Sequence, residues 1–350
     1  GRLENLSEAL DTYEELLATD PKQWDAYRSI ESIHFEKGDA EGVISIIRRE
    51  LDNHESVQER RELRPRLASL LLTEVQDYES CLDEILMVLS ERPEDGAAFE
   101  LLAELVFEWS HPSMEAVERL RARYEDAEDY ESLVKLYQHM VSGAPSDEEK
   151  VDWLEKMFLV RTEELEDPVG AYAVAKISLT LVPQDMTWRE RLLQYAAMSD
   201  QVQDLVDYLE SLLSDEAVLD TDLEMEYRFL FGQVLETPAQ DPEGAVEQYR
   251  LVADSGISDL ATIARERVKN LYKKLESWPE YVELVEQMAA DAPDPEQRRS
   301  LQMEAALIAW ETLEDYDRAQ SLLATPPYSW LRAFQGLKST TTSLERGASV

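Results

Sequence analysis

Two near-copies of one five-residue motif reveal how this chain is organised: DPVGA at 167–171 and DPEGA at 241–245. Asp-Pro is typical of a helix start, because Asp accepts hydrogen bonds from free backbone N–H groups and Pro fits the first turn. The alanine that ends each copy is small enough to let a second helix approach closely. Related Asp-Tyr starts, each with a small residue at the same place, occur at 77–81 and 315–319. The four starts are 90, 74 and 74 residues apart, and Ala9 lies 72 residues before Cys81.

A second series of helices falls halfway between these starts. Its members run over Asp39 to Ile47, Asp129 to Tyr137, Gln201 to Leu209 and Trp278 to Val285. The repeating unit is therefore 72–74 residues long and holds four helices, or two hairpins of about 36 residues. The 90-residue step carries about 18 extra residues, which predicts one additional helix near 96–124, over either 96–110 or 114–124.

Between the breaks the apolar residues follow helical spacing. Leu205, Leu209, Leu212 and Leu213 occur at i, i+4, i+7 and i+8, and no sustained apolar–polar alternation or Asn-Gly turn indicates a strand. Breaks come every 15 to 20 residues. The pattern predicts an all-α chain of many short antiparallel helices.

The period and its residues resemble the tetratricopeptide repeat family. The second helix of that family has a small residue, an apolar one four later, a small or apolar one three later, and Pro after five more. Three copies match, at Ala9, Tyr13, Leu16 and Pro21, at Cys81, Ile85, Val88 and Pro93, and at Ala171, Ala175, Ser178 and Pro183. First-helix positions match at Tyr27, Ile30, Glu31 and His34, at Phe99, Leu102, Ala103 and Val106, and at Arg189, Leu192, Leu193 and Ala196.

The resemblance implies a right-handed superhelical solenoid of roughly nine helix hairpins over residues 1–325, which serves as a surface for protein partners. In the family the first helix of each hairpin lines a concave groove. Carried onto the matching positions, the candidate partner-binding groove consists of Asp25, Arg28, Ser32, Phe35, Glu36, Glu100, Glu104, Phe107, Glu108, Glu190, Gln194 and Met198. This groove is acidic with some apolar positions, which favours a basic protein or peptide.

Composition excludes several classes of function. The formal net charge of −41 repels phosphate backbones, so we expect no nucleic-acid partner. The sparse glycines allow no phosphate-binding loop, and the single Cys and four His build no zinc site or disulfide framework. No Ser elbow or His-Glu-x-x-His motif is present, so we expect neither an enzyme nor a cofactor nor a bound metal.

Two groups of residues have spacings that could suit a metal ion. Glu50 and His54 lie one helical turn apart but lack a third ligand, which favours a surface ion pair. Asp220, Asp222 and Glu224 resemble the start of a calcium loop, but Met225 and Phe231 replace its Gly and Glu. Capping of a helix by Asp220 or Thr221 explains this cluster better.

Residues 192–227 contain ten acids and no Lys or Arg. Three interpretations remain open: a solvated outer face, a docking surface for a basic partner, or association with divalent ions. Asp200, Asp204 and Asp207 are expected on one helical face, and we name them the acidic patch.

The last residues have the opposite charge. Residues 318–350 contain four basic residues and a single acidic one, Glu345. In the same segment Trp330, Leu331, Phe334 and Leu337 form an apolar stripe at helical spacing. We expect an amphipathic helix over 326–338 that closes the array, followed by a flexible Ser/Thr-rich tail over 339–350. The alternatives are docking onto a neighbouring copy, hence self-association, or packing on further repeats.

The function predicted from sequence is thus a non-enzymatic protein-interaction scaffold with an acidic concave surface. The alternative is a structural spacer within a larger repeat protein, with no ligand of its own. No apolar run is long enough to span a membrane and no signal segment is visible, so we expect no membrane insertion and a cytoplasmic location.

Overall fold

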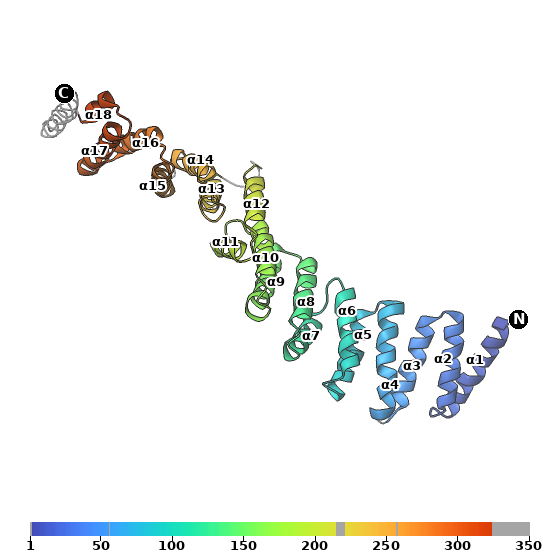
Figure 1. Ribbon diagram of the computed structural model, residues 1–350. Helices are drawn as coiled ribbons and strands as arrows, with labels where there is room; N and C mark the ends of the chain where they lie inside the picture. The colour runs from blue at the N-terminus through green and yellow to red at the C-terminus, as the bar shows by residue number, and fades with distance from the viewer. Residues whose placement is uncertain (1, 56, 215–220, 257, 324–350) are drawn as a thin grey trace, which may run out of the picture. The chain divides into compact units, whose positions relative to one another are not determined.

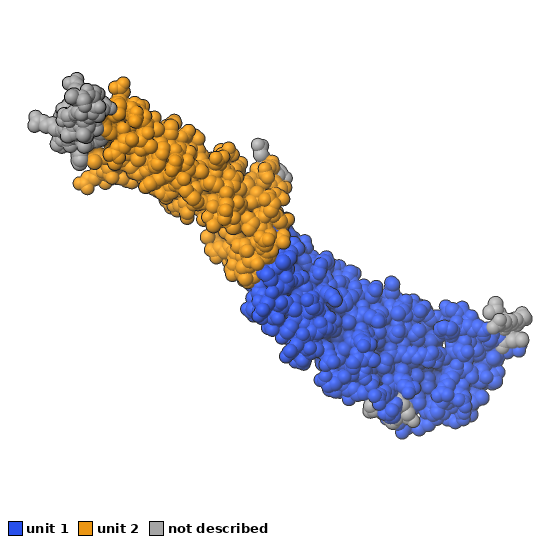
Figure 2. Space-filling view, viewed as in Figure 1, with its two compact units in different colours: residues 1–183 blue, residues 184–350 orange. Residues whose placement is uncertain are grey.

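The computed structural model describes residues 2–55, 57–214, 221–256 and 258–323. These residues form eighteen α-helices and two short π-helical segments, and no β-strand occurs among them. Figure 1 labels the helices in chain order. The chain divides into two compact units, residues 1–183 and 184–350, which Figure 2 colours separately.

The helices have similar lengths in both units. Unit 1 contains α1 (Arg2–Thr19), α2 (Trp24–Lys37), α3 (Ala40–Asn53), α4 (Val57–Leu70) with η1 (Leu71–Val75), α5 (Tyr78–Glu91), α6 (Gly96–Glu108), α7 (Met114–Asp126), α8 (Tyr130–Gly143), α9 (Asp147–Leu159) with η2 (Val160–Glu164), and α10 (Pro168–Leu181). Unit 2 contains α11 (Met186–Met198), α12 (Val202–Ser214), α13 (Thr221–Glu236), α14 (Pro242–Asp254), α15 (Ser258–Lys274), α16 (Trp278–Asp291), α17 (Pro295–Glu311) and α18 (Tyr316–Leu323).

One tight turn recurs and defines the hairpins. In each copy a residue with positive φ, in the left-handed region, separates the first helix of a hairpin from the second. In six of these turns the next residue is an Asp whose carboxylate accepts a hydrogen bond from a backbone N–H of the second helix. Examples are Asp167, which accepts from Gly170 (2.9 Å), and Asp241, which accepts from Gly244 (3.0 Å). At these hairpin turns the residues with positive φ are Gly38, Gln76, Glu128, Glu166, Asp200, Gln240, Glu276 and Glu314.

These turns measure the repeat directly. Successive turns lie 34 to 40 residues apart, except for the 52 residues between Gln76 and Glu128. In that interval both α6 and α7 are present, where one first helix would suffice. The described chain therefore consists of eight hairpins (α2–α3, α4–α5, α7–α8, α9–α10, α11–α12, α13–α14, α15–α16 and α17–α18), together with α1 and α6.

The core lies between the two helices of each hairpin and between neighbouring hairpins. Its contacts join helices that are adjacent or next-but-one along the chain, such as α13 with α14 and α15. Four of the small residues that the motif predicts are fully buried, namely Cys81, Ala171, Ala245 and Ala319, whereas Ala9 is half-buried. Burial raises the pKa of the Cys81 thiol to about 12, so this cysteine acts as a small apolar residue.

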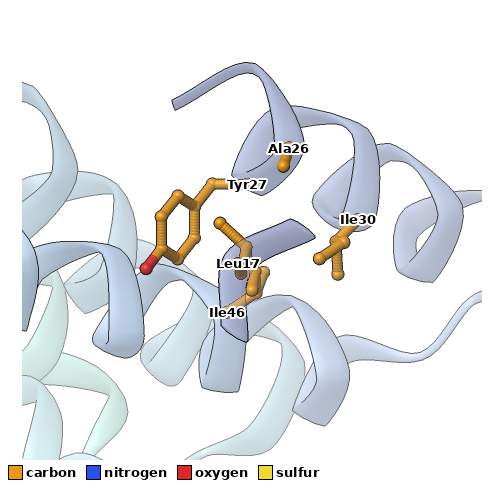
Figure 3. Packing of buried hydrophobic residues seen from close by; sticks show 5 residues of the cluster. All are labelled: Leu17, Ala26, Tyr27, Ile30 and Ile46. Atoms are coloured by element: carbon orange, nitrogen blue, oxygen red, sulfur yellow. The ribbon is translucent and has the colours of Figure 1, made fainter. Parts of the chain in front are cut away.

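The first core cluster shows how apolar residues from three helices meet. Leu17 of α1, Tyr27 and Ile30 of α2, and Ile46 of α3 pack together with Ala26 (Figure 3). The sequence motif placed Leu16 at the apolar position, but Leu16 is largely exposed and Leu17 is buried. The side of α1 that faces the core carries Leu10, Tyr13 and Leu17, so the buried position is one residue later than the motif predicts.

Two first helices end in a π-helical turn. At the end of η1 the amide of Gln76 donates to the carbonyl of Leu71, and at the end of η2 the amide of Leu165 donates to the carbonyl of Val160 (3.1 Å). Both segments stand directly before the turn and the capping Asp, so they widen the end of α4 and of α9.

The expected closing helix at 326–338 and the tail at 339–350 lie outside the described residues. Among the described helices, none combines the length and the apolar composition that crossing a membrane requires.

Candidate partner-binding grooves

The groove residues predicted on α2 lie on one exposed face of that helix. Asp25, Arg28, Ser32, Phe35 and Glu36 are all exposed. The Phe35 ring keeps 74% of its surface accessible, which is unusual for a large aromatic side chain. This part of the prediction therefore yields an exposed helix face in unit 1.

Three of the four groove residues predicted on α6 line a cavity in unit 1. Glu104, Phe107 and Glu108 line a cavity of about 710 Å³, and Glu100 lies outside it. The other lining residues come from the end of α4 and the start of α5: Leu72, Thr73, Gln76 and Tyr78, with Ala103 of α6.

The groove residues predicted on α11 meet a second cavity, in unit 2. Glu190 lines it, whereas Gln194 and Met198 lie further along α11 and do not. This cavity measures about 680 Å³ and crosses three successive first helices. We call it the unit 2 groove, and it is lined by Met186, Arg189, Glu190, Leu193, Asp222, Glu226, Phe229, Leu230, Gln233, Asp259, Leu260 and Ile263.

The unit 2 groove combines apolar surface with carboxylates. Met186 and Ile263 are 68% and 51% exposed, and Phe229 lies half-buried with its ring against that of Tyr249 (centroids 5.2 Å apart). Each of α11, α13 and α15 contributes at least one acid, namely Glu190, Asp222, Glu226 and Asp259.

The one basic residue that lines the unit 2 groove already has a carboxylate partner. The guanidinium of Arg189 donates to Glu226 (Nη1 to Oε2, 2.5 Å) and lies over the ring of Tyr227 (5.6 Å to the centroid). Its side chain is only 12% exposed. The carboxylates of Glu190, Asp222 and Asp259 therefore leave the groove with a net negative charge.

Ion pairs of this kind join successive first helices elsewhere too. Glu31 of α2, which is buried, accepts two hydrogen bonds from Arg66 of α4, and Lys269 of α15 donates to Glu304 of α17 (3.0 Å). These pairs hold neighbouring first helices in register, and they use basic residues that would otherwise reduce the negative charge of the surface.

The prediction that the acidic patch occupies one helical face is wrong. Asp200 lies in the turn before α12, with φ of 58°, so it is not on that helix. Asp204 is half-buried, and only Asp207 is exposed on α12, where it accepts a hydrogen bond from Gln203 (2.8 Å). The error arose because a left-handed Asp breaks the helical spacing without a Gly or Pro to mark it.

The described residues offer no cluster of metal ligands. No three His, Cys, Asp or Glu side chains among them converge on a point that could hold an ion. Glu50 and His54 lie 3.4 Å apart (Oε1 to Nε2), but only 9% of each side chain is exposed, so the pair does not lie on the surface. The His54 ring stacks on Trp24 (centroids 4.0 Å apart). Asp222 lines the unit 2 groove, and Asp220 lies outside the described residues.

Sequence reasoning missed most of the unit 2 groove. Neither α13 nor α15 carries a first-helix signature, so Phe229, Asp259 and Ile263 were not assigned. The available signal was the turn that follows each first helix, since counting back from Gln240 and Glu276 places α13 and α15 in the same layer as α11.

The hairpins define the class of fold: each unit is an all-α array of tetratricopeptide-like helix hairpins. No family model matches the sequence, and no curated protein matches it. Among solved structures, the chain is similar to a chain of the Naa15/Naa10 complex bound to HypK, with 12% identity and a TM-score of 0.30 over 91% of this chain. It spans half the length of that protein.

Two tetratricopeptide repeat structures are also similar. One is a repeat protein from Parabacteroides merdae (14% identity, TM-score 0.24, 77% of this chain and 93% of that chain). The other is the repeat domain of P58(IPK) (16% identity, TM-score 0.21, 99% of this chain and 95% of that chain). At these identities none of the three assigns a partner to this chain.

Proposed function

We propose that this chain is a non-enzymatic protein-interaction scaffold, and that its unit 2 groove binds a basic, partly apolar segment of a protein partner. The observation that carries the proposal is the composition of that groove, which places exposed Met186 and Ile263 among four carboxylates. Apolar side chains exposed in a groove with polar edges are typical of binding surfaces.

The negative charge of the groove supports a basic occupant. The carboxylates of Glu190, Asp222 and Asp259 come from three helices, so a bound segment meets negative charge along the whole length of the groove. The net charge of −41 adds attraction at longer range, which raises the association rate of a basic segment more than its affinity. The same charge disfavours nucleic acid as a partner, and a cytoplasmic location stays a prediction.

The alternative is a structural spacer, whose concave face should show no exposed apolar side chains. Phe35, Met186 and Ile263 count against it. Binding of a basic amphipathic peptide, measured by fluorescence anisotropy at two salt concentrations, tests the proposal. We expect the affinity to fall as salt rises, because charges are screened over about 8 Å at physiological ionic strength.

A matched pair of variants locates the binding. Ile263→Lys places a positive charge in the groove, whereas Leu251→Lys places the same charge on a similarly exposed position of α14 outside it. We expect Ile263→Lys to weaken binding of the basic peptide at least tenfold and Leu251→Lys to leave it nearly unchanged. Absence of binding by any basic peptide would instead support the spacer.

A further inference from the structure

The unit 1 cavity, lined by residues of α4–η1, α5 and α6, differs in kind from the unit 2 groove. Two helical segments end beside it, η1 at Val75 and α6 at Glu108, and neither has a basic residue in its last turn. The carbonyl groups of a helix C-terminus carry about half a negative charge. Two such ends on one cavity favour a cation.

Side-chain charges at the cavity have the same sign. Glu104 and Glu108 are exposed and lie one turn apart on α6, so both carboxylates face the same side of that helix. No Lys, Arg or His belongs to the cavity lining. The cavity therefore presents negative charge that its own lining does not neutralise.

Two aromatic residues, Tyr78 and Phe107, also line the cavity. Phe107 is 38% exposed and holds its ring nearly perpendicular to that of His139 (centroids 5.3 Å apart, 70°). Tyr78 stacks on Trp109 (5.6 Å, 23°), which fixes the position of its ring at the cavity. A cation that enters the cavity can contact the faces of these rings as well as carboxylates.

The backbone of the opposite wall is distorted. The π-helical turn of η1 and the left-handed Gln76 (φ 58°) carry Leu72, Thr73 and Gln76 along the cavity. Single π-turns within helices occur often at functional sites. Here the wider turn places Thr73 and Gln76, two polar residues, among the lining residues.

We propose that this cavity binds the guanidinium group of an arginine side chain from the partner protein, an inference that rests on the proposed function in so far as the partner is basic. The planar guanidinium has five N–H donors, which suit two carboxylates and the polar wall together, and it stacks on aromatic rings. A lysine ammonium offers a more strongly hydrated point charge, so arginine is preferred to lysine.

The test uses the full chain and the peptide Ser-Gly-Arg-Gly-Ser, with lysine and citrulline versions of the same peptide, in calorimetric titrations at low salt. Citrulline keeps the shape of arginine without its charge. We expect the arginine peptide to bind at least threefold more tightly than the lysine peptide, and the citrulline peptide not to bind. Equal affinity for arginine and lysine peptides contradicts the proposal.

Variants place the binding in the cavity. Glu104→Gln with Glu108→Gln should lower the affinity for the arginine peptide at least tenfold. The matched control, Glu100→Gln with Glu115→Gln, removes two exposed charges from α6 and α7 outside the cavity lining and should change it little. Phe107→Leu should reduce the preference for arginine over lysine, a change that general loss of stability does not produce.

The outcomes separate this inference from the proposed function. If Ile263→Lys abolishes binding of the arginine peptide and the Glu104/Glu108 variant does not, the unit 1 inference is wrong and the scaffold function stands. If no basic peptide binds anywhere, both are wrong.

Discussion

Arg189 of α11 and Glu226 of α13 form an ion pair (2.5 Å) at the unit 2 groove, and it joins two successive first helices. Arg189 is mostly buried and Glu226 is about half exposed. The pair therefore both holds the hairpins together and withholds a positive charge from any bound segment.

Removal of the Glu226 charge tests both roles. Glu226→Gln should lower the free energy of unfolding by roughly 0.5–1 kcal/mol, since it leaves the Arg189 guanidinium without its carboxylate in a half-exposed pair. It should also weaken binding of a basic peptide. Glu247→Gln on α14 removes an exposed acid outside the groove and serves as the control for both measurements. Unchanged peptide binding in Glu226→Gln would argue against a basic occupant of this groove.

At the hairpin turns, replacing a residue with positive φ by glycine should raise the free energy of unfolding. Glu128 has φ of 53°, where a side chain is strained and glycine is not, so Glu128→Gly should stabilise the protein by up to about 1 kcal/mol. Gly38→Ala should destabilise it by about 1 kcal/mol for the same reason (φ 68°), although no atom obstructs the added methyl group. Denaturant titration measures both.

Gly96→Ala is the control for these turns. Gly96 is the first residue of α6 and has open space around it without positive φ, so alanine should be neutral or slightly stabilising there. A similar loss of stability in Gly38→Ala and Gly96→Ala would show that the left-handed conformation carries no special cost.

Close approach of α13 and α14 depends on Gly232. A methyl group there would lie 2.6 Å from Cε1 of the buried Tyr249 ring, which cannot move without disturbing the core. Gly232→Ala should therefore cost about 1–3 kcal/mol in thermal or denaturant unfolding. Adding Tyr249→Leu should recover part of that loss in a double-mutant cycle, and strict additivity of the two changes would contradict the proposed clash.

Glu50 makes the stability depend on pH in the opposite sense to most acids. Burial raises the pKa of its carboxyl, and the hydrogen bond from His54 only partly offsets this. A raised folded-state pKa means that the contribution of Glu50 to stability is present below its unfolded pKa of about 4.3 and is lost as pH rises through the folded value. Glu50→Gln should thus be more stable than the parent at pH 7, with the gain vanishing near pH 4.

Asp39 provides the contrasting case in the same hairpin. The backbone N–H of Gly42 and the imidazole of His34 lower the pKa of its carboxyl, so its contribution is present above about pH 4 and is lost as pH falls through the folded value. Asp39→Asn should lose stability at pH 7 and match the parent in acid. At pH 7 the unfolding curves of the two variants should therefore shift in opposite directions relative to the parent, and in acid both should lie close to it.

The repeat was predictable because its markers are local. Asp167, Asp241 and the buried alanines that follow them act within one helix start, so their spacing alone reveals the hairpins. The extra helix was visible only as surplus length, with 96–110 and 114–124 as alternative positions, and the structure has a helix at both, α6 and α7.

The groove was less predictable because exposure depends on neighbouring helices. Phe229 and Phe231 are two residues apart on α13 and chemically identical, yet Phe229 lines the groove and Phe231 is buried in the core. Likewise, nothing in the residue type of Gln76 or Asp200 indicates a left-handed turn. These positions are set by how hairpins stack, which a single sequence does not contain.

The contacts of this fold have a consequence for how the chain folds. Since α-helices meet partners that are adjacent or next-but-one along the chain, contacting residues are close in sequence and the contact order is low. Chains of low contact order need little loop closure before contacts form, so they fold quickly. Folding can start at any hairpin and spread to its neighbours, and a helix such as α6 can be inserted without separating residues that must find each other across a long stretch of chain.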